Sequence, residues 1–223
     1  MRHPLKAEKF FTKEEKERIR DATVKAEAKT IGEIAVAVVD RSSRYHEAEV
    51  LGGIFLGGVI SLVLTTFFFH GSVWSFIPLA FVFFFPSHLL FKAFPALNAA
   101  FTGRKRRELA VKERALRTFY EKGLYKTTAS TGVLFFLSLL ERKVWVLADR
   151  GIHSKIHQPT LNKFANLVSA GIQQGRAADA LCEAINEMGN LLASHYPAGG
   201  EAHKDQLCDD VICGPGASET DGE

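Results

Sequence analysis

The segment from Leu51 to Phe91 contains no Asp, Glu, Lys or Arg, although charged residues stand close to both of its ends. It also holds ten of the 18 Phe residues of the chain. Two apolar halves, 50–69 and 73–91, are separated by His70-Gly71-Ser72. At about 1.5 Å per residue, each half as a helix reaches roughly the 30 Å thickness of the hydrocarbon core of a bilayer. Neither half has the polar face that a soluble helical hairpin needs. The segment therefore predicts a transmembrane hairpin.

The flanking charges predict how this hairpin is oriented. Arg41 and Arg44 precede the first span, and Lys92 and the basic cluster Arg104–Arg107 follow the second. The connecting turn carries no basic residue. Because basic residues are retained on the cytoplasmic side, we expect both termini in the cytoplasm and a multi-pass protein of the bacterial inner (plasma) membrane. The charged N-terminal segment also lacks the apolar stretch of a secretory signal peptide.

Two glycine pairs in the first span, Gly52-Gly53 and Gly57-Gly58, place small residues four positions apart. Such spacing allows two helix backbones to approach closely in a membrane. The partner helix is either the second span of the same chain or another copy. The second alternative gives a homodimer through Gly53 and Gly57.

The remaining sequence alternates between helical and strand patterns. Thr12 and Glu15 have the spacing of a capping box, which predicts a helix from Thr12 to about Thr30. The apolar run from Glu33 to Asp40 is typical of a strand that is covered on both faces. After the hairpin, the patterns predict an amphipathic helix ending near Gly123, followed by strands at 131–140 and 143–148 joined by a tight turn at Glu141-Arg142, and helices at about 154–173 and 177–195.

This order of elements predicts an α/β fold, a small three-layer, Rossmann-like sandwich with a mixed sheet, interrupted by a two-helix transmembrane hairpin. We expect the first part of the domain at 11–49, the hairpin at 50–91 and the second part of the domain at 104–197. From 198 to 223 the chain is rich in Gly, Asp and Glu, and we expect a disordered tail.

Two sequence motifs resemble the TPM domain, a family formerly defined only as a domain of unknown function. One is Glu27-x-x-Thr30-x-Gly32-Glu33-Ile34, and the other is the predicted hairpin from Gly132-Val133-Leu134 to Gly151. Within that family the chain resembles a bacterial subgroup of membrane proteins that carry a hydrophobic hairpin after the first strand. The resemblance implies an α/β sandwich and two kinds of function, a binding or assembly module and a phosphatase for which metal binding has been proposed.

Strand topology brings these motifs together in the predicted fold. A strand, a helical crossover and a second strand form a parallel pair, and the third strand then returns antiparallel. The end of the third strand therefore lies at the same sheet edge as the start of the first. The resulting candidate ligand or metal residues are Glu27, Thr30, Glu33 and Asp149, supported by Arg150 and Gly151. Three carboxylates and a hydroxyl suit a hard cation such as Ca²⁺ or Mg²⁺; alternatively, Glu27 pairs with a base and Thr30 caps a turn.

The sequence contains little evidence for other classes of function. The net charge of +3 is too small to indicate nucleic-acid binding, and neither GxxxxGK[ST] nor GxGxxG is present. The three cysteines form no CxxC motif, and no serine has an evident base partner. We therefore expect a binding or assembly module that contacts the lipid bilayer and a membrane-protein partner and serves membrane-protein maintenance. The alternative is a divalent-metal-dependent phosphatase that uses the acidic sheet edge.

Overall fold

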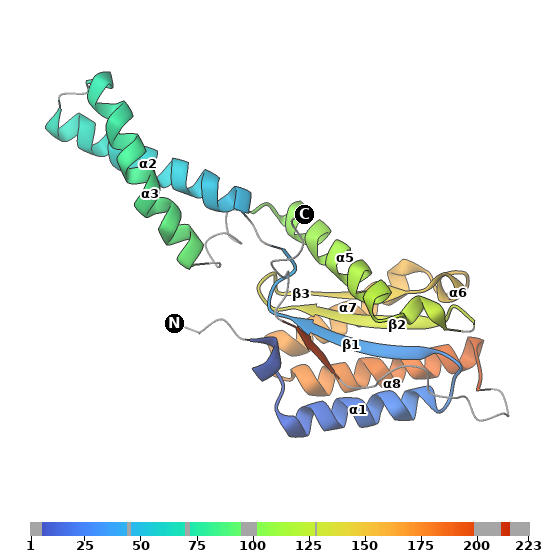
Figure 1. Cartoon of the computed structure of the whole chain (residues 1–223). Helices are drawn as coiled ribbons and strands as arrows, with labels where there is room; N and C mark the ends of the chain where they lie inside the picture. Colours follow the sequence, from blue (N-terminus) through green and yellow to red (C-terminus); the bar gives the residue numbers. More distant parts are fainter. Residues whose placement is uncertain are drawn as a thin grey trace. The chain divides into compact units, whose positions relative to one another are not determined.

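The computed structural model describes residues 6–43, 46–69, 72–94, 102–127, 129–198 and 211–214. The chain forms two compact units, and two separate stretches of sequence build the first of them. That unit, the α/β domain, consists of residues 1–43 and 108–223, whereas residues 44–107 form the hairpin unit. Figure 1 shows the elements of each unit.

A mixed sheet of four strands lies at the centre of the α/β domain, in the order β3-β2-β1-β4. Strand β1 (Glu33–Val39) pairs in parallel with β2 (Gly132–Ser138), with Glu33 opposite Gly132. Strand β3 (Lys143–Ala148) returns antiparallel beside β2, and β4 (Ile212–Gly214) pairs in parallel with β1. The structure confirms the predicted α/β class and the mixed sheet.

Alternate residues of the central strands enter two separate cores, which gives the domain three layers. Ile34, Val36 and Val38 of β1 face helices α1 (Lys13–Glu27), α7 (Gln158–Gln173) and α8 (Ala177–His195). The intervening Ala35, Ala37 and Val39 face helix α5 (Arg104–Glu121). Every residue of β1 and β2 is buried, because a strand covered on both faces has no solvent side. Figure 1 shows α5 lying along the sheet, and Leu124, just after this helix, belongs to the same core.

Three local predictions need correction. The helix expected from about residue 154 begins at Gln158 in α7, because Pro159 occupies the first turn, where proline starts helices; Arg150–His153 forms a separate short helix, α6. The turn between β2 and β3 spans four residues, 139–142, and Arg142 has a φ of 51°. In the tail that we expected to be disordered, Ile212–Gly214 forms β4, because its backbone pairs with β1; residues 199–210 and 215–223 lie outside the described part.

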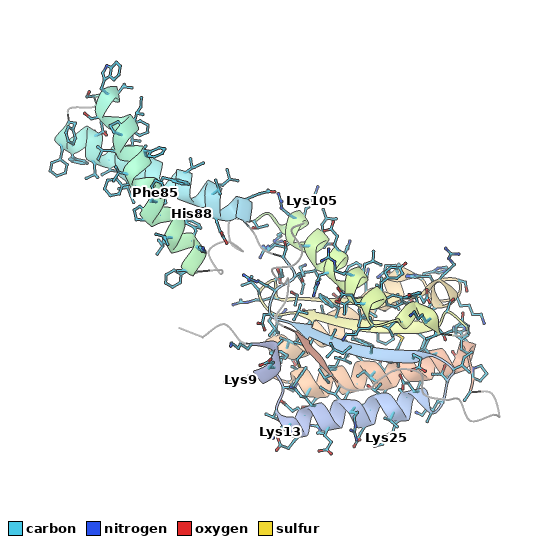
Figure 2. The ribbon with its side chains drawn as sticks, in the orientation of Figure 1. Lys9, Lys13, Lys25, Phe85, His88 and Lys105 are labelled. Atoms are coloured by element: carbon cyan, nitrogen blue, oxygen red, sulfur yellow. The ribbon has the colours of Figure 1, made fainter. Side chains whose placement is uncertain are left out.

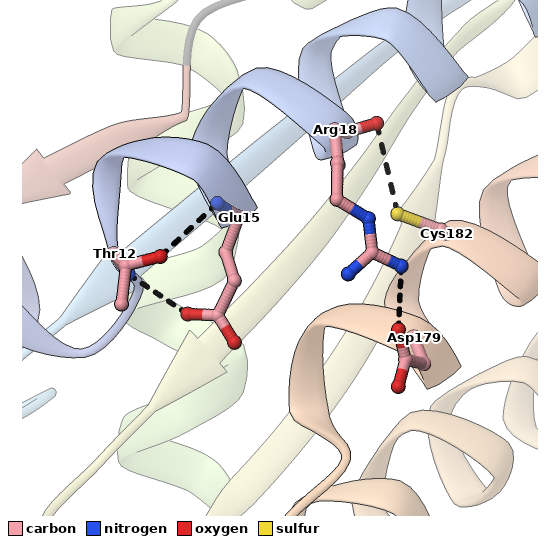
Figure 3. A network of polar contacts seen from close by, with 5 residues as sticks. All are labelled: Thr12, Glu15, Arg18, Asp179 and Cys182. Atoms are coloured by element: carbon pink, nitrogen blue, oxygen red, sulfur yellow. Dashed lines mark hydrogen bonds and ion pairs between the residues drawn. The ribbon is translucent and has the colours of Figure 1, made fainter.

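Helix α1 is capped and clamped to α8 (Figure 3). The Thr12 hydroxyl accepts from the Glu15 N–H, and the Glu15 carboxylate accepts from the Thr12 N–H, as the capping box predicted. An ion pair joins Arg18 to Asp179 at 2.6 Å, and because both side chains are exposed it adds little to stability. Beside it, the Cys182 thiol lies 3.7 Å from the Arg18 carbonyl oxygen, and burial raises the pKa of Cys182. Cys182 is thus a packing residue at this contact.

The hairpin unit consists of α2 (His46–Phe68) and α3 (Val73–Ala93). Within them, 49–68 and 73–93 are long and apolar enough to cross a membrane. Their large apolar side chains point outward along both helices (Figure 2); Phe67 is 80% exposed and Trp74 is 88% exposed. These helices therefore lack the buried apolar stripe of helices in a soluble core.

The glycines of α2 lie against α3. A Cβ on Gly53 would lie 3.2 Å from His88, and a Cβ on Gly57 would lie 3.0 Å from the backbone of Phe83 and Phe84. A Cβ on Gly52 would overlap the Phe91 ring. The glycine face thus serves packing within one chain, which is one of the two alternatives that the spacing left open. A homodimer through Gly53 and Gly57 would first have to displace α3.

Replacing Gly57 by Leu is expected to separate α2 from α3, because the added side chain meets backbone atoms that cannot move aside locally. We expect a loss of about 1–3 kcal/mol in the free energy of unfolding, measured by denaturation in detergent micelles. Gly58→Leu is the matched control, because a Cβ at Gly58 has no atom within 4 Å. Equal losses in the two variants would contradict this packing.

Candidate functional site

Both motifs that resemble the TPM domain meet at one edge of the sheet. Ala148, the last residue of β3, pairs with Val133 of β2, which in turn pairs with Ile34 of β1. The Asp149 N–H continues the ladder by donating to the Gly132 carbonyl at 2.9 Å. The chain segments that contain Glu27–Glu33 and Asp149–Gly151 therefore lie at the same edge, in the arrangement that strand topology predicts.

Thr30 is completely buried and joins the start of β1 to the end of α8. Its hydroxyl donates to the Tyr196 carbonyl at 2.6 Å and accepts from the Gly32 N–H at 3.1 Å. The Ile31 N–H donates to the same Tyr196 carbonyl, and Thr30 forms a β-bridge with Pro197. Both polar functions of the Thr30 side chain are thus used within the fold.

Glu27 and Glu33 each take part in a hydrogen bond with a backbone group. The Glu27 carboxylate accepts from the Ile34 N–H at 2.6 Å, which ties the last turn of α1 to β1. Glu33 is buried in β1, and its N–H donates to the Thr131 carbonyl at 3.2 Å. The Glu27 carboxylate thus binds the Ile34 N–H of β1, which would otherwise need an acceptor from a neighbouring strand.

Asp149 begins the short helix α6. One carboxylate oxygen, Oδ1, accepts from the Arg150 N–H at 2.7 Å, as at a helix N-cap. The other, Oδ2, is buried and has no hydrogen-bond partner among the described residues. Gly151 approaches the preceding loop so closely that a Cβ would lie 2.5 Å from the Ser130 carbonyl oxygen, so only glycine fits. The Arg150 side chain is exposed.

Tyr196 completes this edge, and the sequence analysis did not select it. Its hydroxyl donates to the Gly151 carbonyl at 2.6 Å, while its own carbonyl accepts from Thr30. Lys155 Nζ lies 4.3 Å from the centre of the Tyr196 ring. The sequence around Tyr196 indicates only that it follows the last helix. Its role could not be predicted because it depends on contacts with residues distant in sequence.

The candidate ligand residues do not converge on one point. Across the described ranges, no group of three His, Cys, Asp or Glu residues is arranged to hold a metal ion. Glu27, Thr30 and Asp149 each bind backbone groups at a different place along the edge. The alternative in which Thr30 caps a turn fits these contacts, and Glu27 accepts a hydrogen bond from the Ile34 N–H of β1.

A second polar cluster, also missed by the sequence analysis, lies at the opposite edge, beyond the carboxyl ends of β1 and β2. The Ser42 hydroxyl donates to the Ser138 hydroxyl at 2.7 Å, and the Ser138 hydroxyl donates to the Glu141 carboxylate. The Ser42 N–H also donates to Glu141, at 3.1 Å. All three residues are buried, with Glu141 only 4% exposed. The cluster binds the chain leaving β1 to the turn after β2.

The architecture, an α/β domain with a mixed sheet and a separate apolar helix pair, can now be compared with known proteins. Residues 101–191 match the family model described as the TPM domain. This part of the chain, which includes the second motif from Gly132 to Gly151, is therefore similar to the TPM domain. No curated protein sequence matches it significantly.

A solved structure shows the same fold at low sequence identity. It is the NMR structure of the BA42 protein from the psychrophilic bacterium Bizionia argentinensis. The two proteins share 18% identity with a TM-score of 0.58, over 92% of this chain and 96% of BA42. At this identity the likeness concerns the fold alone.

The structural role of Glu27 can be separated from a role that needs its charge. Glu27→Ala removes the acceptor of the Ile34 N–H, and we expect it to lower the free energy of unfolding by about 1–3 kcal/mol. Glu27→Gln keeps a side-chain oxygen acceptor and should retain most of this stability. Denaturation followed by circular dichroism measures both variants, with Glu17→Ala, an exposed position of α1, as the control. A Gln variant as unstable as the Ala variant would show that the negative charge itself is required.

Proposed function

We propose that the chain is a membrane-anchored protein whose cytoplasmic TPM domain acts as a binding or assembly module for a membrane-protein partner. The main observation that supports it is the helix pair α2–α3, whose outward side chains are apolar along two lengths that match a bilayer. In water such exposed surface would cause aggregation, whereas in a bilayer it has a favourable environment. The cytoplasmic side follows from the basic residues that flank the pair.

The state of the candidate site favours binding over catalysis. Thr30 donates a hydrogen bond to the residue after α8, and Glu27 accepts one from β1. Asp149 accepts one from the first residue of α6. Side chains used in this way form a rigid frame, on which exposed surfaces can recognise another protein. Maintenance of other membrane proteins is a function that such an anchored module could serve.

The proposed orientation is tested by two reporters, one inserted at Gly71 and one fused to the C-terminus. We expect alkaline phosphatase to be active only at Gly71, and green fluorescent protein to be fluorescent only at the C-terminus. The reason is that the basic residues on both flanks of the hairpin stay inside. An active alkaline phosphatase at the C-terminus would overturn the cytoplasmic assignment.

The unpartnered Asp149 Oδ2 supports a second candidate, a divalent-metal-dependent phosphatase that uses Ca²⁺ or Mg²⁺ at this edge. The name of the matching family model also contains the word phosphatase. In this alternative Asp149 contributes a ligand, and the nearby Glu27 and Glu33 contribute negative charge.

The two functions differ in their response at Asp149. For a binding module, we expect no hydrolysis of p-nitrophenyl phosphate by the purified full chain with either ion, and co-purification of a membrane partner. Asp149→Asn keeps the cap to the Arg150 N–H and should leave stability nearly unchanged, whereas Asp149→Ala should cost about 1 kcal/mol. Turnover that needs a divalent ion and is lost in both variants would establish the phosphatase instead.

A further inference from the structure

The outer surface of α5 has an unusual composition for a solvent-facing helix. Leu109, Leu116 and Tyr120 recur at intervals of seven and four residues, and therefore lie on one stripe. All three are exposed, Leu109 and Tyr120 by 57% each. The opposite side of the same helix buries Val111, Ala115 and Phe119 against the sheet. Helix α5 is thus apolar on both sides.

Aromatic residues next to α5 extend this stripe. The exposed Tyr125 ring lies 5.2 Å from the Tyr120 ring, between centroids. Trp145 of β3 is partly exposed beside the helix, with Lys112 Nζ 4.5 Å from the centre of its ring. Lys126 Nζ lies 5.6 Å from the centre of the Tyr125 ring. We call Leu109, Leu116, Tyr120, Tyr125 and Trp145 the α5 outer face.

The charge around this face is strongly positive. Residues 104–126 contain nine Lys or Arg and three Asp or Glu, although the whole chain carries a net charge of only +3. Two of the three acidic residues, Glu108 and Glu121, lie within 4.0 Å of a base on the same helix. Helix α1, on the other side of the sheet, has five basic and five acidic residues and one exposed large apolar side chain, Val24.

We propose that the α5 outer face lies on the anionic surface of the lipid bilayer. Tyr and Trp with apolar bodies and polar tips, flanked by Lys and Arg, are typical of side chains at the level of lipid head groups. Basic residues close to an anionic surface are attracted to it. The combination of an apolar stripe and a basic border matches this environment and distinguishes α5 from the charge-balanced α1.

The chain length between the hairpin and α5 is consistent with this contact, which rests on the proposed membrane anchor. Helix α3 ends at Ala93, and α5 begins at Arg104. The intervening residues span at most roughly 35 Å even when fully extended. If α3 crosses the bilayer, the start of α5 is therefore held near its surface at a high effective concentration. A weak affinity of the face for lipid is then sufficient for stable contact.

Two native tryptophans allow the contact and the anchor to be tested separately in the full chain. Trp74→Phe leaves Trp145 on the α5 outer face, and Trp145→Phe leaves Trp74 in α3. Each variant is reconstituted into phosphatidylcholine vesicles with or without about one-third phosphatidylglycerol, with a nitroxide quencher at head-group depth. We expect the fluorescence of Trp145 to be quenched in the anionic vesicles. This quenching should be clearly weaker in neutral vesicles and at about 1 M salt, where charges are screened beyond a Debye length of about 3 Å.

A second experiment replaces the exposed apolar residues of α5. In the Trp74→Phe protein, Leu116→Ser with Tyr120→Ser should lower the ratio of lipid-bound to lipid-free domain by roughly tenfold, because two apolar side chains lose their burial. Both positions are exposed, so the fold should be unaffected. The control is Val24→Trp on α1, in a protein with both native tryptophans replaced by Phe, and it should remain unquenched.

The outcomes distinguish the inference from the proposed function. Quenching of Trp74 without quenching of Trp145 would overturn the lipid contact and leave the anchor in place. Absence of quenching at both tryptophans would overturn the anchor as well. Equal quenching of Trp145 in neutral and anionic vesicles would refute the anionic surface, and a Trp145 emission that is protected from water without lipid quenching would point to a protein on this face.

Discussion

The parallel pairing of β1 with β2 is the interaction on which the rest of the domain depends. It joins two stretches of chain that the hairpin unit separates, and both sheet faces and both sheet edges are built around it. Contacts of such long sequence separation carry a loop-closure cost that grows only slowly with length. The antiparallel packing of α2 on α3 returns the chain towards its starting point, as the approach of Gly53 to His88 and of Gly52 to Phe91 shows. The insertion is therefore compatible with a single core.

Hydrogen bonds secure this pairing at each end. At the amino end, the Thr131 hydroxyl donates to the Ile31 carbonyl, and Thr30 binds the end of α8. At the carboxyl end, Ser42, Ser138 and Glu141 form a buried network just before the chain enters the hairpin unit. Buried hydroxyl and carboxylate groups that satisfy one another hold a unique register, whereas a slipped pairing would leave them unpaired. This explains why both edges are polar in an otherwise apolar core.

The local sequence pattern was sufficient to predict the helices and strands whose own residues carry the signal for their structure and burial. The buried runs of β1 and β2, the capping box of α1, the amphipathic pattern of α8 and the uncharged hairpin all carry their signal within a few turns or one strand length. Strand β4 could not be predicted in this way, because three residues acquire strand geometry only by pairing with β1. The same holds for Tyr196 and for the Ser42–Glu141 contact, whose partners lie far away in sequence. The segments that hold the candidate residues meet at one sheet edge as the predicted topology requires, but the partner of each side chain depended on tertiary contacts.

The edge of β1 that faces β4 shows how an acidic residue can serve the fold. Because N–H groups alternate along a strand, the Ile34 N–H points to the same side as that of Asp40, which donates to Gly214 of β4. Strand β4 pairs with β1 from Ala37 to Val39, and among the described residues no strand pairs with the first half of this edge. The Glu27 carboxylate binds the Ile34 N–H there and places a charged side chain where another strand would pair. Charged side chains and short edge strands are two ways in which proteins prevent edge-to-edge association. Glu27 and β4 together protect this edge of β1.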